Sequence, residues 1–312
     1  MAPGASLLGR VLGAAPAPIE ASARMTAAML ADAAHALDVL DVLDGDPPVD
    51  PFEARDPDYI RETLPALRAA SGLWFRSRVR GLDNIPEDEA VLLVGNHSGG
   101  TLIADTFVFA QSFYDRFGPD RAFHQLAHDM VFKVPGVRSA LARYGTVPAS
   151  PENMRRALGE GAALLVYPGG DHESYRPSWE SADIDFAGRK GFARLALELD
   201  VPIVPVVAIG GQETALFLGQ GRGLASRLQL DRLLRLKVFP AQVAPPIGLT
   251  LLDLPLRVPL PAKITIEVLP RVDLRAQLGQ RASADDAYEL ITTSMQDTLT
   301  ELDEERTLPV LG

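Results

Sequence analysis

The sequence predicts an α/β fold with a mostly parallel central sheet flanked by helices, preceded by an N-terminal helical segment. Short apolar runs alternate along the chain with segments whose apolar residues recur at helical spacing, which is typical of parallel sheets covered by helices. Glycine, proline and small polar residues separate these segments. With 312 residues, 47% of them hydrophobic, the chain is long enough for one large domain and an appended helical piece.

The N-terminal part is predicted to differ from the rest. Residues 1–18 are rich in Ala, Pro and Gly and are expected to be flexible. Residues 19–44 show helical spacing, and a second helix is expected at about 57–71. The first helix is acidic, which favours packing on the main domain over anchoring to an anionic membrane. The predicted division is a flexible N-terminus (1–18), N-terminal helices packed on the core (19–72) and the α/β domain (73–312).

Apolar runs predict the strands of the sheet. The segment Trp74–Gly81 alternates like a strand. The other predicted strands are Ala90–Gly95, Ala122–Leu126, Gly145–Pro148, Ala162–Tyr167, Ile203–Ile209 and Ile264–Leu269. Helices are predicted after Ser150, which suits an N-cap, along Phe192–Leu199, and from about Ser283 onward.

Residues 239–263 form a proline-rich stretch with almost no charge. So many prolines exclude a regular helix. An apolar loop of this length is expected either to be buried against the sheet or to touch acyl chains or a membrane interface.

Composition limits the classes of function. A net charge of −11 argues against nucleic acid as a partner, although residues 121–194 carry ten basic and eight acidic side chains and could bind an anionic small molecule. The absence of cysteine excludes disulfides, thiolate metal sites and a cysteine nucleophile. There is no apolar run of about 18 residues and no secretory signal pattern. We expect a cytoplasmic protein, with peripheral contact at the inner face of a membrane as the alternative, and not a secreted one.

The segment Gly95–Asp105 places a histidine and a carboxylate in a glycine turn after a predicted strand. His97 suits a general base because an imidazole exchanges a proton near neutral pH, and a carboxylate can fix its tautomer. The simpler alternative is that Asn96 and Ser98 cap a helix while His97 fills a turn.

A second constellation, Tyr167–Glu173, also follows an apolar run and contains Pro-Gly-Gly. Its glycines let the backbone approach a ligand closely, and Asp171 or Glu173 can hold a hydroxyl. Because parallel strands end at one edge of a sheet, this loop and His97 are expected to face the same crevice. His172 is an alternative base.

A third segment, Arg189–Leu197, begins a predicted helix that leads to a buried strand. Arg189 and Lys190 combine two cations with the free N–H groups of a helix start, which suits a phosphate or a carbonyl oxygen.

In this order, the motifs resemble the glycerolipid acyltransferase (PlsC-like) superfamily, and most closely its branch resembling diacylglycerol acyltransferase type 2. The resemblance covers roughly residues 74–270. It rests on Asn-His after a strand, Gly-Thr-Val-Pro at 145–148, Tyr-Pro-Gly-Gly with a later Glu, Arg-Lys-Gly-Phe, and Val-Pro-Ile-Val-Pro-Val at 201–206.

The resemblance implies a glycerol-3-phosphate-acyltransferase-like fold and transfer of a fatty acyl group from acyl-CoA or acyl carrier protein to a glycerolipid or lipid-alcohol hydroxyl. His97 would deprotonate the hydroxyl without a covalent acyl-enzyme, with Asp105 as its candidate partner. The predicted substrate contacts are Asn96, Ser98, Gly99, Gly100, Gly169, Gly170, Asp171, His172, Glu173, Arg189 and Lys190. No metal or other cofactor is required.

Two departures from the family pattern bear on mechanism. In the family pattern the Asp stands five residues after the His, a position that Leu102 occupies in this chain. The nearest Asp is Asp105, eight residues after His97. On one continuous helix the two would lie about 80° apart, so we predict a non-helical turn at 98–100 and a helix from about Thr101. Pro148 stands near the position where phosphate-handling members often carry Arg, which makes a neutral acceptor as plausible as lysophosphatidate.

Three alternatives remain open at this point. A lipid esterase or thioesterase would use similar groups, although there is no Gly-x-Ser-x-Gly motif and Ser98 directly follows His97. A non-catalytic lipid-binding protein would keep the crevice without the chemistry. His124 and His128 would share a strand face, either as metal ligands or as part of the acyl crevice.

Overall fold

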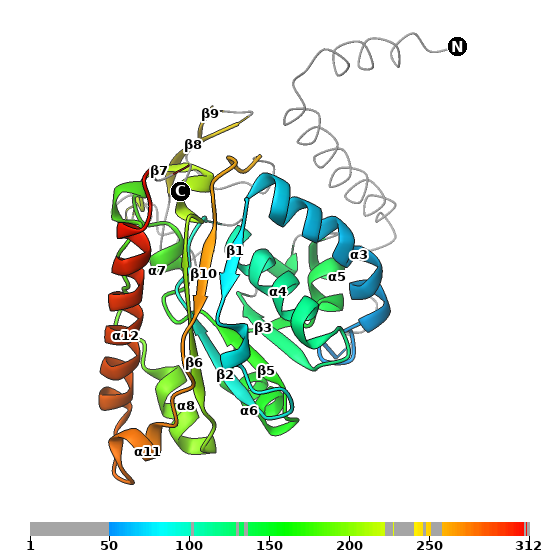
Figure 1. Ribbon diagram of the computed structural model, residues 1–312, viewed down its shortest axis with the longest axis vertical. Helices are drawn as coiled ribbons and strands as arrows, with labels where there is room; N and C mark the ends of the chain where they lie inside the picture. Colours follow the sequence, from blue (N-terminus) through cyan, green and yellow to red (C-terminus); the bar gives the residue numbers. More distant parts are fainter. Residues whose placement is uncertain are drawn as a thin grey trace.

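The computed structural model describes residues 50–100, 103–128, 131–133, 137–221, 227, 240–245, 248–250, 258–308 and 310. Its centre is a seven-stranded sheet (Figure 1). In spatial order the strands are β1 (Arg78–Arg80), β10 (Thr265–Val268), β6 (Ile203–Ile209), β2 (Val91–Gly95), β5 (Ala163–Val166), β3 (Phe123–Ala127) and β4 (Thr146–Pro148). The predictions for residues 1–18 and 19–44 lie outside the described residues.

The sheet is mostly parallel, as predicted. β6, β2, β5, β3 and β4 run in the same direction. β10 pairs antiparallel with β6, and β1 pairs parallel with β10, so these two strands run the other way. The starts of β1 and β10 therefore lie at the same edge as the carboxyl ends of the other five strands.

Helices and short turns connect the strands. Before and between the first strands lie α3 (Pro57–Ala69), η2 (Ala70–Trp74), η3 (Leu82–Asn84), α4 (Ala104–Phe117), η4 (Val131–Lys133) and α5 (Val137–Arg143). Further along are α6 (Pro151–Gly159), α7 (Asp171–Ser174), η5 (Ser178–Glu180), α8 (Gly191–Leu199), η6 (Gln212–Thr214), α11 (Leu274–Leu278) and α12 (Ala284–Glu304). Ser150 and Ser283 cap α6 and α12 as predicted, each accepting a backbone N–H.

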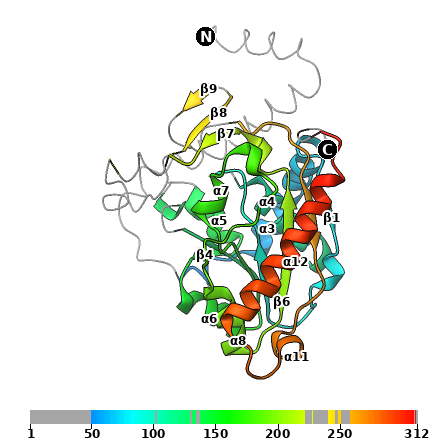
Figure 2. The same ribbon diagram turned by 90° about the vertical axis from the view of Figure 1, so that its left-hand side faces the viewer.

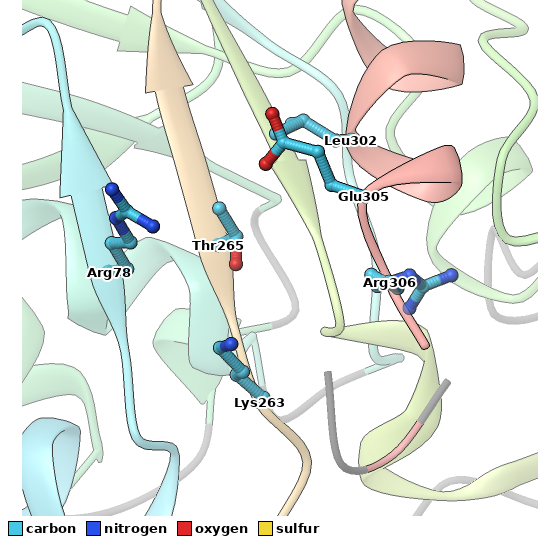
Figure 3. Close-up of a pocket in the computed structure, with 6 residues that line it drawn as sticks. All are labelled: Arg78, Lys263, Thr265, Leu302, Glu305 and Arg306. Carbon is cyan, nitrogen blue, oxygen red and sulfur yellow. The ribbon is translucent and has the colours of Figure 1, made fainter. Parts of the chain in front are cut away.

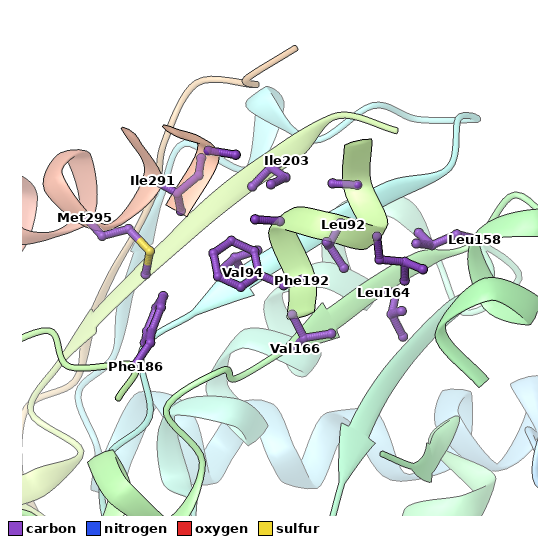
Figure 4. Packing of buried hydrophobic residues seen from close by; sticks show 14 of the residues in the cluster. Leu92, Val94, Leu158, Leu164, Val166, Phe186, Phe192, Ile203, Ile291 and Met295 are labelled. Carbon is purple, nitrogen blue, oxygen red and sulfur yellow. The ribbon is translucent and has the colours of Figure 1, made fainter. Parts of the chain in front are cut away.

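Two apolar clusters cover the two faces of the sheet, because successive strand residues point to opposite sides. Leu92 and Val94 of β2 belong to the cluster under α6, α8 and α12, whereas Val91 and Leu93 belong to the cluster under α3 and α4. Figure 4 shows the first cluster, where Phe192 and Met295 approach the strands from the helices. The central strands are thus buried on both faces, which explains their continuous apolar sequence.

A second, three-stranded antiparallel sheet follows β6. It consists of β7 (Leu216–Gly219), β8 (Ala241–Ala244) and β9 (Gly248–Thr250). It lies beyond the carboxyl end of β6 (Figures 1 and 2). Of the proline-rich stretch 239–263, residues 241–244 and 248–250 form strands and residues 258–263 are irregular, while 239, 246–247 and 251–257 lie outside the described residues. No helix in the described part of the chain is long and apolar enough to cross a membrane.

Candidate active site

Asn96 connects the end of β2 to the neighbouring strand. Its side chain is fully buried, its Nδ2 donates to the Ala208 carbonyl at 2.8 Å, and its Oδ1 accepts the Ala208 N–H at 2.8 Å. The amide therefore extends the pairing of β2 with β6 and directs His97 onto the carboxyl edge. Both polar groups of Asn96 are used inside the fold, so its predicted substrate contact stays a prediction.

The turn after His97 is non-helical, as predicted. Gly99 and Gly100 have φ values of 86° and 65°, a left-handed backbone that glycine adopts at little cost. The Gly99 N–H donates to Gln212 Oε1 at 3.0 Å, and the Gly100 N–H donates to the Ser174 carbonyl at 2.9 Å. These N–H groups bind neighbouring loops, and the predicted substrate contacts of Gly99 and Gly100 stay predictions. Helix α4 begins at Ala104, three residues later than expected, and residues 101–102 lie outside the described part of the chain.

His97 is 9% exposed and stacks on Tyr167, with ring centroids 4.5 Å apart and ring planes 20° apart. Its backbone N–H donates to Glu173 Oε2 at 3.1 Å. Burial, with the nearby Arg176 guanidinium, lowers the pKa of His97 to about 4. Its buried Nδ1 has no hydrogen-bond partner among the described residues. The imidazole is therefore neutral at pH 7 and able to accept a proton.

Asp105 does not bind the histidine, so the expected pairing is wrong in this structure. Its Oδ2 accepts the Ser98 hydroxyl at 2.8 Å, and its Oδ1 accepts the Thr106 N–H at 2.8 Å. The carboxylate is 1% exposed, and burial raises its pKa to about 6. The glycine turn brings Asp105 back to Ser98, the residue that follows His97. By accepting the Ser98 hydroxyl, the carboxylate stabilises the turn next to the base. The Ser98 hydroxyl, also predicted to contact substrate, is used by this bond.

The second predicted loop lies beside the first, as expected from the shared sheet edge. Glu173 is 1% exposed. Its Oε2 accepts the His97 N–H, and its Oε1 accepts the Asp185 N–H at 3.1 Å. Its Oε1 also lies 3.7 Å from Arg176 Nη1. Burial raises the pKa of Glu173 to about 7, opposed by Arg176 and the two N–H bonds. The side chain packs so closely on Gly169 that a Cβ there would lie 2.2 Å from Oε2.

The predicted anion contacts are engaged within the protein. Arg189 Nη1 donates to the Gly169 carbonyl at 2.8 Å, and its Nη2 donates to Asp171 Oδ1 at 2.9 Å. Arg189 thus braces the loop at Gly169 and Gly170, where Gly170 has a φ of 49°. Lys190 pairs with Asp285 of α12 at 3.0 Å, and its predicted role beside the substrate stays a prediction.

The other described histidines, His124, His128 and His172, also have protein partners. His172 Nε2 contacts the Asp185 carboxylate, whereas the buried His97 Nδ1 has no hydrogen-bond partner among the described residues. His124 Nδ1 lies 3.0 Å from the Gly145 carbonyl oxygen, and its ring packs on Phe52. Within the described residues, no group of three or more His, Asp or Glu side chains is arranged to hold a metal ion.

Three residues of the site were given no role in the prediction: Arg176, Gln212 and Tyr167, which was named only as the start of the second loop. Tyr167 and Gln212 follow β5 and β6 at the same edge as His97, and a polar residue after each central strand is a signal that could have identified them. Arg176 stands three residues after Glu173 and is 5% exposed. A buried arginine is not apparent from the sequence pattern alone.

Comparisons with known proteins find similarity to acyltransferases. The acyltransferase family model matches residues 76–209. An uncharacterized protein of Mycobacterium tuberculosis is 33% identical over 222 residues, covering 71% of this chain and 59% of the relative. The human DGAT1/2-independent enzyme synthesizing storage lipids is 30% identical over 150 residues, covering 48% of this chain and 45% of the relative. The chain thus spans less than two thirds of the length of these relatives.

The fold resembles that of a solved acyltransferase. The crystal structure of the 1-acyl-sn-glycerophosphate acyltransferase PlsC from Thermotoga maritima matches with a TM-score of 0.51 and 18% identity, covering 79% of this chain and 81% of that one. At this identity the likeness concerns the fold alone. Residues 76–209, which the family model matches, contain both loops that meet at His97. Residues 76–209 of this chain thus match the acyltransferase family model, and the chain shares the fold of PlsC.

Proposed function

We propose that the protein transfers a fatty acyl group from an acyl thioester to a hydroxyl of a glycerolipid or lipid alcohol. The observation that carries this proposal is the neutral His97 imidazole, placed at the carboxyl edge of the sheet by β2 and supported by the Tyr167–Glu173 loop. An acyltransfer to a hydroxyl needs a base of this kind. The donor, whether acyl-CoA or acyl carrier protein, and a cytoplasmic location are parts of the same proposal.

In the proposed reaction, His97 removes the proton from the acceptor hydroxyl while the oxygen attacks the thioester carbonyl. The tetrahedral intermediate then collapses, the carbon–sulfur bond breaks, and the imidazolium returns its proton to the departing thiolate. The products are an ester and a free thiol, and no acyl group becomes attached to the protein. Glu173 holds the His97 backbone and Tyr167 holds the ring plane, so both act as positioning residues.

The test is a thiol-release assay with purified protein, using an acyl-CoA or acyl carrier protein donor and a panel of acceptors: monoacylglycerol, diacylglycerol, a long-chain alcohol and lysophosphatidate. We expect thiol release that requires an acceptor and falls by about 10²–10⁴-fold in His97→Ala, with circular dichroism confirming that the variant is folded. Thiol release without any acceptor would identify a thioesterase instead. Lipid binding without turnover would identify a binding protein, and full transfer by His97→Ala would exclude the mechanism.

A further inference from the structure

The two strands at one edge of the central sheet carry charged side chains on the face under α12. β1 pairs in parallel with β10, so Arg78 lies opposite Thr265 and Arg80 lies opposite Glu267. Residues two apart on a strand share a face of the sheet. The residues of β10 that alternate with these belong to the cluster under α3 and α4. Both cross-strand pairs therefore face α12.

The Arg80–Glu267 pair is electrically balanced. The Arg80 Nε contacts the Glu267 carboxylate on the neighbouring strand. Its Nη1 lies 3.2 Å from Oε2 of Glu305, the residue that follows α12. The Arg80 guanidinium thus has two carboxylate partners, one from the sheet and one from the end of the helix.

The Arg78–Thr265 pair has the arginine without the carboxylate. Lys263, two residues before Thr265, adds a second cation diagonally opposite Arg78. In the described part of the chain, neither the Arg78 nor the Lys263 side chain has a hydrogen-bond or ion-pair partner. Diagonal neighbours on adjacent strands lie within reach of long side chains, and like charges at that separation repel. This part of the sheet therefore lacks a negative charge.

A pocket of about 110 Å³ lies between these side chains (Figure 3). It is lined by three residues of the sheet edge and three at the end of α12: Arg78, Lys263, Thr265, Leu302, Glu305 and Arg306. The volume exceeds the roughly 10–15 Å³ that one water molecule needs, and it falls short of the roughly 300 Å³ of pockets for drug-sized ligands. The pocket therefore suits one small group, such as a phosphate, and not a whole nucleotide or an acyl chain.

The charges at the end of α12 leave the two cations unmatched. Arg306 has its own carboxylate partner at 2.6 Å, and Glu305 pairs with the arginine of the balanced pair. Glu301 and Glu304 do not line the pocket. At 100° per residue they lie about 100° and 200° around the helix from Leu302, which does line it.

We infer that Arg78, Lys263 and Thr265 bind a phosphate group, either inorganic phosphate or a phosphate monoester. Phosphate oxygens accept hydrogen bonds from a guanidinium, an ammonium and a hydroxyl, and the first two bonds are charge-assisted. The pocket lies on the α12 face of the sheet, whereas Tyr167, on which His97 stacks, packs against the cluster on the opposite face. The site is therefore separate from the candidate base. It does not depend on the proposed function, although a phosphate-bearing donor or acceptor of that reaction is one source of the group.

Thr265→Glu is the most direct test, because it gives this cross-strand pair the carboxylate that the balanced pair already has. With a dissociation constant on the order of 1 mM, about 20 mM inorganic phosphate should raise the Tm of the wild type by about 2–4 °C relative to chloride of equal ionic strength. Thr265→Glu should lose this shift while keeping its Tm in chloride. Because phosphate also stabilises proteins by exclusion from their surface, the difference between the two proteins is the readout.

Single substitutions test the two cations. Arg78→Gln and Lys263→Gln should each weaken phosphate binding by about 10-fold or more, since each removes a charge-assisted hydrogen bond. The matched control is Arg281→Gln, which removes an exposed arginine just before α12 and should bind phosphate like the wild type. The 21 residues of α12 place it about 30 Å from the pocket. No phosphate shift in the wild type, or an equal shift in Thr265→Glu, would overturn the inference.

Further probes identify the source of the phosphate. CoA compared with dephospho-CoA tests the 3′-phosphate of an acyl donor, and glycerol 3-phosphate tests the headgroup of an acceptor. A Tm shift that Thr265→Glu abolishes assigns the site to the probe that causes it, and a shift with inorganic phosphate alone assigns it to the free ion. Phosphate binding without acyl transfer would leave the inference intact and reject the proposed function, whereas acyl transfer without phosphate binding would do the reverse.

Discussion

The contact between Gly211 and the Ser98–Asp105 pair makes a sharp test of how the turn beneath His97 is held. Gly211 has φ −65° and ψ −36°, so alanine can adopt its backbone conformation without strain. A Cβ at this position would nevertheless lie 2.2 Å from Ser98 Oγ and 3.4 Å from Asp105 Oδ2. Gly211→Ala must therefore displace the Ser98 hydroxyl from the carboxylate.

The expected cost follows from that displacement. Losing a hydrogen bond to a buried carboxylate costs about 1.5–3 kcal/mol. Overpacking of a rigid region adds about 1–3 kcal/mol. The lower chain entropy of alanine in the unfolded state offsets about 0.4–1 kcal/mol. Gly211→Ala should therefore lower the free energy of unfolding by about 2–5 kcal/mol, and it should also lower kcat because the turn carries the base.

Urea denaturation followed by circular dichroism measures the change in stability. The matched control is Gly191→Ala at the start of α8, where a Cβ would meet no atom within 4 Å. This control should stabilise the protein by up to about 1 kcal/mol. In a Ser98→Ala background both the hydrogen bond and the clashing oxygen are absent, so the cost of Gly211→Ala should fall by about 2–5 kcal/mol. If Gly211→Ala and Gly191→Ala differ by less than about 0.5 kcal/mol, the proposed packing is refuted.

Three further predictions concern the base and its supports. The pKa of His97 is lowered to about 4 in the folded protein, so between pH 4 and 6.5 the unfolded chain binds more protons than the folded one. The free energy of unfolding should therefore fall by about 1.5 kcal/mol from this group when the pH drops from 6.5 to 5. His97→Gln should lack this pH dependence in urea titrations, and parallel curves for the two proteins would contradict the lowered pKa. Tyr167→Leu should cost about 0.5–1.5 kcal/mol more stability than Tyr167→Phe, because only the phenyl ring can stack on the imidazole; equal thermal unfolding of both variants would count against the stack. At pH 8, Glu173→Gln should lower kcat and cost about 1–3 kcal/mol, since an amide oxygen cannot accept the N–H groups of both His97 and Asp185 as the two carboxylate oxygens do; an unchanged kcat would reject the positioning role.

The local pattern was sufficient for the scaffold. Continuous apolar runs such as Val91–Gly95 predict buried parallel strands, because a strand covered on both faces has no polar side. The rule that parallel strands end at one edge correctly brought the Gly95–Asp105 and Tyr167–Glu173 loops together. The non-helical turn at 98–100 was predicted from the eight-residue offset between His97 and Asp105, and it forms with Gly99 and Gly100 at positive φ although that pairing does not. The reversed direction of β10 was not predictable, because apolar periodicity does not encode strand direction.

The partners of the polar side chains were the part that sequence reasoning did not supply. Asp105 was expected to meet His97 but binds Ser98, and Lys190, expected at the substrate, pairs with Asp285. In each case several groups of suitable charge lie within reach, and the choice depends on packing contributed by other elements.

The sequence by itself determined the α/β architecture, the position of the histidine at a strand end and the likeness of residues 76–209 to acyltransferases. These features depend on short-range spacing and on the burial of apolar side chains, both of which are written in the order of residues. Only the tertiary structure decided that Tyr167, Glu173 and Arg176 surround the base, and that Arg78 and Lys263 line one pocket with the end of α12. The physical reason is that hydrogen-bond partners and pockets form between segments distant in sequence, so they exist only once the sheet has brought those segments together.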